Sequence, residues 1–337
     1  PILEATGTVR AAQEVSLRPR ISGRVVKISD SLTPGSFVKK GEMLLQIDPE
    51  DYEQRLKQQE AQLRQAQAEL EIEKGRKEAA EWDYEYLSKN KSRLNEDLLL
   101  RKPQLKSARA GVTSARAQIK EAELALERTT LKAPFDAHVI QRDATIGSEI
   151  TPGTEVARLV GTNAYWVETT LPQRALKYVA IPTPDEENER GSKATLRNRA
   201  AWPEESRRTG YVIRKIGALE PNTRLVKLLI EVNDPLSLEP KNDDKPDLML
   251  DAYHHVEIKG KPIKNIVRVP RDYLRKNNTI WVYQNGKLSI RDVAIRFKDA
   301  QYAYISEGLK DGDRVITTSL STVKDGAPLQ HLSDKNE

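Results

Sequence analysis

The chain has 337 residues, contains no cysteine and has only two methionines, Met43 and Met249. Without cysteine there can be no disulfide, thiolate metal site or cysteine nucleophile, and two methionines are too few for a thioether cluster that binds cuprous ions. No segment approaches the ~20 consecutive apolar residues of a membrane-spanning helix. Aromatic residues make up only 5%, and 55 basic residues are mixed with 50 acidic ones. This pattern disfavours nucleic-acid binding.

The sequence shows no pattern typical of a catalytic or cofactor site. No glycine-rich phosphate loop, nucleophile elbow or paired-acid arrangement stands out, so we expect no enzymatic activity, no cofactor and no metal site. The histidines are His138, His254, His255 and His331. His254 and His255 are neighbours, and in a strand they would point to opposite faces and could not chelate one metal together. We expect them to be hydrogen-bonded or to face solvent.

A half-motif of short apolar strands and turn glycines occurs twice, on either side of a long polar segment. The glycines are Gly23, Gly35 and Gly41 in the first copy and Gly147 and Gly153 in the second. In both copies two glycines lie six residues apart. Two copies of one half-motif predict a single small β-domain, formed by residues 18-49 and 130-160, with the glycines at its turns.

The segment between the half-motifs carries heptad repeats. Leu56, Leu63 and Leu70 lie seven apart in its first arm. The predicted seam of the second arm is Leu98, Leu105, Val112, Ile119 and Leu126. A polar break near the midpoint divides two arms of about 38 residues, and each arm would span roughly 57 Å as a helix. The pattern predicts an antiparallel coiled-coil hairpin over residues 50-129.

Three features should disturb this hairpin. The first arm loses its apolar stripe around Glu73 and Lys77, and Gly75 should weaken it further. Pro103 removes a backbone donor in the second arm, so the helix there should kink or restart. We therefore expect a bent or loosened distal half.

The C-terminal half has the pattern of short strands. Segments 165–171, 210–213, 225–232 and 253–258 predict a small β-barrel, to which we assign residues 11-17 and 161-262. The remaining residues, 1-10 and 263-330, are assigned to a second all-β domain. Its clearest signal is the Asn285-Gly286 hairpin turn between alternating strands. The expected fold class is mainly β with an α-helical hairpin.

Several of these features together resemble the periplasmic adaptors, or membrane fusion proteins, of tripartite efflux pumps, most closely those of the resistance-nodulation-division (RND) type. They are the split half-motifs, the heptad hairpin, the junction 131–136, Val269-Pro270 and the turn 308–313. The resemblance implies an elongated multidomain chain with an α-hairpin, a lipoyl-like domain, a β-barrel and a membrane-proximal β-domain. It also implies a periplasmic location, with a tether to the inner membrane supplied by a segment upstream of Pro1.

The resemblance further implies partners. The chain would link an inner-membrane transporter of drugs or other solutes to an outer-membrane channel, and six copies would form a ring in the assembled pump. Channel docking would fall on the hairpin tip, where we expect Leu87, Lys89, Lys91, Arg93 and Leu94. The usual family tip has Arg, Leu and Ser where this chain has Asp83, Leu87 and Leu94, so only the leucine at position 87 matches the family pattern. Alternatively, the two leucines only close the hairpin.

Other functions remain open at this point. The chain could serve an ABC-type exporter or a type I secretion system. From a different class, it could be a coiled-coil scaffold or a carrier protein. A lipoyl or biotinyl carrier needs an exposed lysine on the turn between the half-motifs, and here the helical hairpin occupies that place.

Ala137 and Asp251 replace glycines common in the family, which predicts modest local changes of the backbone.

Overall fold

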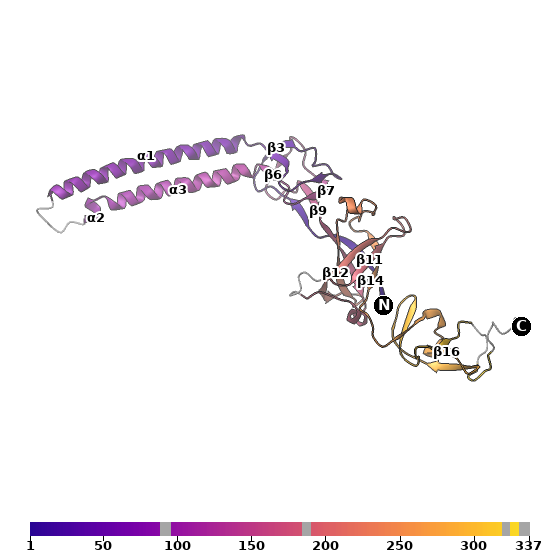
Figure 1. Cartoon of the computed structure of the whole chain (residues 1–337). Coiled ribbons are helices and arrows are strands. Elements are labelled where there is room, and N and C mark those ends of the chain that lie inside the picture. The colour runs from indigo at the N-terminus through magenta and orange to yellow at the C-terminus, as the bar shows by residue number, and fades with distance from the viewer. Residues whose placement is uncertain (88–95, 184–189, 319–323, 330–337) are drawn as a thin grey trace. The chain divides into compact units, whose positions relative to one another are not determined.

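The computed structural model describes residues 1–87, 96–183, 190–318 and 324–329 (Figure 1). The chain forms two compact units. The hairpin unit is Glu14–Gly161, and the barrel unit combines Pro1–Gln13 with Thr162–Glu337. Within the described residues, no helix is long and apolar enough to cross a membrane.

The hairpin unit contains a β-sandwich built from both half-motifs. One sheet has the order β2-β9-β7-β4, and the other has the order β6-β5-β3-β8. The strands are β2 (Glu14–Leu17), β3 (Gly23–Ile28), β4 (Phe37–Val38), β5 (Met43–Ile47), β6 (Thr130–Lys132), β7 (Ala137–Arg142), β8 (Glu149–Ile150) and β9 (Ala157–Gly161). Each sheet therefore pairs strands from before and after the helices. The shared core includes Leu44 and Ile47 from the first half-motif and Val139 and Leu159 from the second, all fully buried.

The helical hairpin connects β5 to β6, which are neighbours in one sheet. It consists of α1 (Glu50–Leu87), α2 (Glu96–Leu99) and α3 (Lys102–Glu127). The first arm has the predicted 38 residues and runs without a break through Gly75, and the distal half of the hairpin is interrupted in the second arm instead. The predicted restart at Pro103 is confirmed, because Arg101 takes a left-handed conformation (φ 54°) and Pro103 lies in the first turn of α3. A proline is well tolerated there, since its missing N–H would have no helical acceptor.

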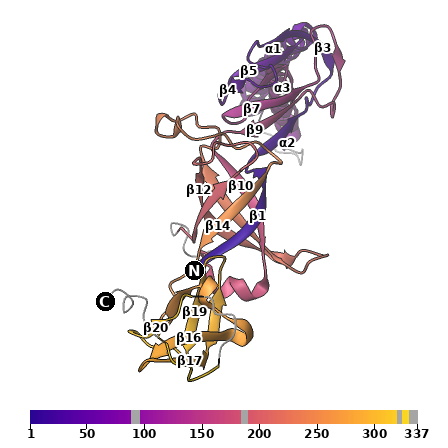
Figure 2. The same ribbon diagram turned by 90° about the vertical axis from the view of Figure 1, so that its right-hand side faces the viewer.

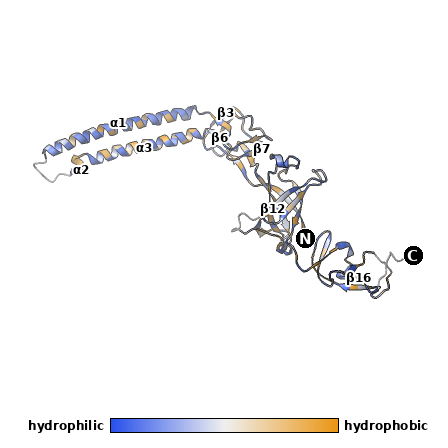
Figure 3. Cartoon of the chain, viewed as in Figure 1, coloured by the Kyte–Doolittle hydropathy of each residue, from blue (hydrophilic) through white to orange (hydrophobic). Residues whose placement is uncertain are grey.

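The seam between the arms follows the heptads only as far as this restart. Leu105, Val112, Ala115 and Ala122 are buried, and Ile119 and Leu126 are half-buried. Leu98 is 56% exposed, so its assignment to the seam was wrong. It lies on α2, and the left-handed turn at Arg101 interrupts the helical periodicity that would have carried it to the seam. The helices are mostly hydrophilic, with apolar residues interspersed along them (Figure 3).

The barrel unit begins with a closed barrel of order β1-β10-β13-β12-β11-β14. The strands are β1 (Ile2–Ala11), β10 (Ala164–Leu171), β11 (Lys193–Arg197), β12 (Arg208–Leu219), β13 (Val226–Asn233) and β14 (Tyr253–Lys259). Figure 2 shows β1 beside β14 in the barrel wall.

The two N-terminal boundaries that we predicted were wrong. Residues 1-10 belong to the barrel and not to the last β-domain, because β1 pairs with β10 on one side and β14 on the other. Residues 11-17 do not form a barrel strand, because β2 pairs with β9 in the sandwich. Removing β1 would leave two open strand edges, which explains why the barrel needs a strand so far away in the sequence.

The last part of the barrel unit contains two three-stranded sheets, β15-β19-β18 and β17-β16-β20. The strands are β15 (Val267–Pro270), β16 (Thr279–Gln284), β17 (Lys287–Asp292), β18 (Ala294–Lys298), β19 (Tyr302–Glu307) and β20 (Arg314–Val315). The predicted Asn285-Gly286 turn joins β16 to β17, and both residues have positive φ. Ile280, Val282 and Ile305 are buried in the core of this C-terminal β-domain.

Candidate functional site

The described residues nearest the distal end of the hairpin expose large apolar side chains. Trp82 is 79% and Tyr86 is 87% exposed, and their spacing of four places them on one face of α1. Leu98 and Leu99 of α2 are also exposed. Exposed apolar groups gathered at one end of an element are typical of a surface that binds a partner. The sequence analysis did not single out Trp82 and Tyr86. Neither residue falls on the apolar heptad positions of the first arm, and large aromatic residues off the seam would have indicated an exposed apolar surface.

The residues predicted for the tip itself fall mostly outside the described part of the chain. Leu87 is the last residue of α1, while Lys89, Lys91, Arg93 and Leu94 lie outside the described residues. Asp83, which stands where the family tip usually has an arginine, is exposed. The assignment of these residues to docking therefore stays a prediction.

An ion pair joins the two arms where the apolar seam ends. Arg101 donates from Nε to Glu73 Oε1 at 2.7 Å and from Nη2 to Oε2 at 3.1 Å. Glu73 is only 7% exposed, although its position in the heptad would normally hold an apolar residue. The hydrogen bonds from Arg101 lower the pKa of Glu73, and those to Glu73 raise the pKa of Arg101. The pair holds the arms in register through two charge-assisted hydrogen bonds.

The five turn glycines all have positive φ, between 82° and 150°. Three of them also link the half-motifs through backbone hydrogen bonds. Gly35 N donates to Val139 O at 2.9 Å, Gly41 N to Ala133 O at 2.8 Å, and Gly147 N to Val25 O at 2.8 Å. Each turn therefore ties one copy of the half-motif to the other, and the sandwich can stay closed around the base of the hairpin.

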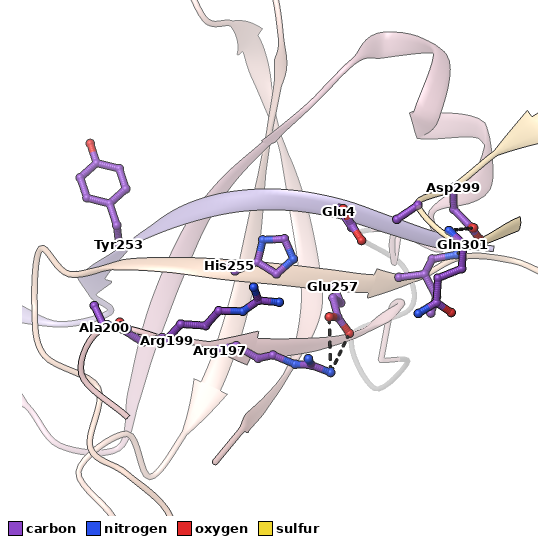
Figure 4. A pocket seen from close by; sticks show the side chains of 12 residues that line it. Glu4, Arg197, Arg199, Ala200, Tyr253, His255, Glu257, Asp299 and Gln301 are labelled. Carbon is purple, nitrogen blue, oxygen red and sulfur yellow. Dashed lines mark hydrogen bonds and ion pairs between the residues drawn. The ribbon is translucent and has the colours of Figure 1, made fainter. Parts of the chain in front are cut away.

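A groove of about 740 Å³ lies on the outer face of the barrel (Figure 4). Arg197 of β11 pairs with Glu257 of β14 at 3.4 Å, and Arg199 and His255 lie beside them. Among the residues that the structure describes, no three His, Cys, Asp or Glu side chains are placed to hold a metal ion. The lining carries charges of both signs, and Arg197 and Glu257 form an ion pair, so the groove suits a polar contact surface.

One end of this groove is formed by Asp299, which connects β1 to the C-terminal β-domain. Its carboxylate accepts hydrogen bonds from Tyr304 Oη at 2.7 Å and from three backbone N–H groups, including Ile2 N of β1 at 3.4 Å. Burial acts to raise the pKa of Asp299, but these hydrogen bonds outweigh it and lower the pKa. Asp299 is therefore an ionised structural acceptor.

The histidines differ in part from what we expected. His254 is 2% exposed with its ring 4.7 Å from that of Trp202, and neither ring nitrogen has a partner within the described ranges. The expectation that it would be hydrogen-bonded or face solvent was wrong, because Trp202 covers it. Burial lowers its pKa. His255 is half-buried on the outer face, His138 stacks on Phe37, and His331 lies outside the described residues.

The architecture defines a class of protein: a β-sandwich opened to hold a helical hairpin, joined to a barrel and a C-terminal β-domain. Residues 13–160 match the family model of the CzcB-like barrel-sandwich hybrid domain, and residues 270–322 match that of the C-terminal permuted SH3 domain of RND membrane fusion proteins. Together these matches assign the chain to the membrane fusion, or periplasmic adaptor, protein family.

Its relatives and structural neighbours agree with this assignment. The multidrug resistance protein MdtA of Klebsiella pneumoniae is 26% identical over 97% of the chain and 76% of the relative. MdtA of Pantoea ananatis is 25% identical over 97% of the chain and 77% of the relative. The crystal structure of MacA from Actinobacillus actinomycetemcomitans has the same fold, with a TM-score of 0.62 at 19% identity, covering 94% of this chain and 96% of that one.

Proposed function

We propose that this membrane fusion protein is the periplasmic adaptor of a tripartite efflux pump. It links an inner-membrane transporter of drugs or other solutes to an outer-membrane channel, and a segment upstream of Pro1 tethers it to the inner membrane. The observation that carries the proposal is the hairpin itself. An arm of 38 helical residues spans about 57 Å, and its distal part exposes Trp82 and Tyr86. A long arm with an apolar end suits a protein that reaches a distant partner.

The transporter is of the RND type in this proposal. The C-terminal domain, through which an adaptor of this architecture would meet its transporter, matches the model of RND membrane fusion proteins over residues 270–322. This match favours an RND pump over an ABC-type exporter or a type I secretion system. A carrier function is disfavoured, because helices α1 to α3 replace the tight turn on which a carrier holds its lysine.

The channel docks at the distal end of the hairpin. We assign this contact to Leu87, Lys89, Lys91, Arg93 and Leu94 and add Trp82 and Tyr86 from the structure. Aromatic side chains at the centre of an interface commonly contribute most of its binding energy. Lys89, Lys91 and Arg93 would pair with carboxylates of the channel.

The test compares two pairs of substitutions at the distal end of the hairpin with a control substitution near its base. Trp82→Asp with Tyr86→Asp, and separately Leu87→Asp with Leu94→Asp, should reduce cross-linking to the channel by about 30-fold, as expected for hot-spot residues. Efflux should fall with it. Leu124→Asp is the matched control, because Leu124 is an exposed apolar residue of α3 far from the tip. Docking at the distal end is refuted if both pairs retain cross-linking and efflux while helicity is unchanged.

A further inference from the structure

A second groove in the barrel unit is lined by cations. This basic groove, of about 710 Å³, lies between the 3₁₀-helix η1 (Gln173–Tyr178) and β18 of the C-terminal β-domain. Its cationic side chains are Arg174, Lys177, Arg271, Arg296 and Lys298. None of the five forms a salt bridge with another described residue. Only two carboxylates, Glu4 and Asp299, share the lining, and Asp299 already accepts four hydrogen bonds. The groove therefore has an excess of three positive formal charges.

The lining of the basic groove also includes two aromatic side chains that contact each other. Tyr178 is 7% exposed, and its ring centre lies 4.9 Å from that of Phe297. Lys177 Nζ lies 5.0 Å from the centre of the Tyr178 ring, so a cation–π contact holds this ammonium group beside the ring. A lining that combines cations with apolar side chains suits an anion attached to an apolar body.

The groove is a poor site for an extended peptide. β18 is an edge strand, and an edge strand can normally accept a further strand. Here Tyr178 Oη donates to Arg296 O at 3.0 Å, which occupies a carbonyl on that strand. The register of β18 also shifts between Ala294 and Phe297. An irregular and partly occupied edge disfavours strand addition, and the volume is that of a small-ligand site.

We propose that the basic groove binds the phosphate headgroup of an anionic membrane lipid. The cations would contact the phosphate oxygens, and apolar side chains of the lining, among them Tyr178 and Phe297, would lie against the glycerol and the start of the acyl chains. Basic pockets at a membrane surface bind anionic headgroups in this way. The inference rests on the proposed function in one respect, because an adaptor for an inner-membrane transporter would have this groove near a bilayer.

The test is co-flotation of the purified full chain with lipid vesicles. Vesicles of phosphatidylcholine with 30% phosphatidylglycerol should bind the chain, and vesicles of phosphatidylcholine alone should not. Arg174→Gln with Lys177→Gln removes two exposed cations of the groove and should weaken binding by about 25-fold, since each basic residue at a surface contributes about fivefold. Arg214→Gln with Lys215→Gln is the matched control, because it removes two exposed cations of β12 from the same unit. This control should bind as the wild type does.

Three results would overturn the proposal. Equal loss in both double variants would mean that binding follows overall charge and not the groove. If glycerol 3-phosphate binds the chain as tightly as the vesicles do, the ligand is a soluble phosphate ester. If the groove variant keeps vesicle binding but loses transporter capture, the partner is an acidic protein segment. Neither transporter nor channel is present during flotation, so a negative result there would leave the adaptor function, tested by the tip variants, untouched.

Discussion

At the scale of single residues, Gly23 shows how the sandwich depends on one missing side chain. Its φ is 150°, and a Cβ placed there would lie 2.7 Å from Ile47 Cγ2 in the core. Gly41 also has positive φ, but nothing lies within 4 Å of the place where its Cβ would be. An alanine at Gly41 would therefore suffer backbone strain alone, and an alanine at Gly23 would suffer both backbone strain and steric overlap.

We predict that Gly23→Ala destabilises the hairpin unit by about 3 kcal/mol, because strain and overpacking act together. Gly41→Ala should cost about 1 kcal/mol, from strain alone. The measurement is the denaturant midpoint of the sandwich, followed by hydrogen exchange of its strands. Equal midpoints for the two variants would contradict the structural role given to Gly23.

The Glu73–Arg101 pair predicts a response of the hairpin to acid. Because the folded pKa of Glu73 lies below its ordinary value of 4.5, the pair stabilises the folded state fully above that pH. Its contribution is lost as the pH falls through the lower, folded pKa. Glu73→Gln should therefore reduce helicity at pH 7, and the difference from wild type should vanish well below pH 4.5.

Circular dichroism as a function of pH checks this expectation. The matched control is Glu71→Gln, since Glu71 pairs with Lys74 on an exposed part of the same helix. Surface pairs of this kind contribute little. A Glu73→Gln variant that differs from wild type equally at pH 7 and at pH 3 would show that ionisation of Glu73 does not hold the arms together.

At the scale of elements, the hairpin is an insertion between two neighbouring strands. β5 and β6 pair directly, and the turns at Gly35, Gly41 and Gly147 already tie the two half-motifs together. Replacing residues 51–128 by a short turn should leave a folded sandwich, because Tyr52 is the one described residue of the removed segment that packs against its core. Cooperative unfolding of the sandwich in this deletion variant is the expected result. A molten sandwich would mean that the helices complete its core.

The sequence predicts those elements whose signals are local. Heptad spacing predicted the 38-residue first arm, Pro103 predicted the restart, and the repeated glycines predicted a sandwich in two parts. The partners of β1 could not be predicted, because alternation indicates a strand but does not say which sheet it joins. Glu73 looked like a break in the apolar stripe because its partner, Arg101, lies 28 residues away, and the sequence does not indicate that the two residues pair.

A buried arginine of β12 and the basic groove lacked such local signals. Arg208 is 1% exposed and donates to Ser237 Oγ and to the carbonyls of Pro246 and Asn233, which are 25 or more residues away. The basic groove likewise collects cations from η1 and from the C-terminal β-domain. Only the tertiary fold brings these groups together, and mixed charge in the sequence gave no sign of a local excess.

At the scale of the whole molecule, the proposed function requires several copies of the chain. One hairpin cannot enclose a passage from transporter to channel, so copies must stand side by side as a closed ring, which we expect to hold six. The ring contacts should be weak without the partners, because a surface of mixed charges is not expected to offer a large apolar patch for self-association. Alone, the purified chain should be a monomer or a loose dimer at low concentration.

The most direct test of this account is the mass of the complex that the chain forms with its transporter and its channel. The account predicts one particle that contains both membrane proteins and several adaptor copies, six if the ring is complete. A complex that saturates at one adaptor, or an adaptor that never joins transporter and channel in the same particle, would contradict it.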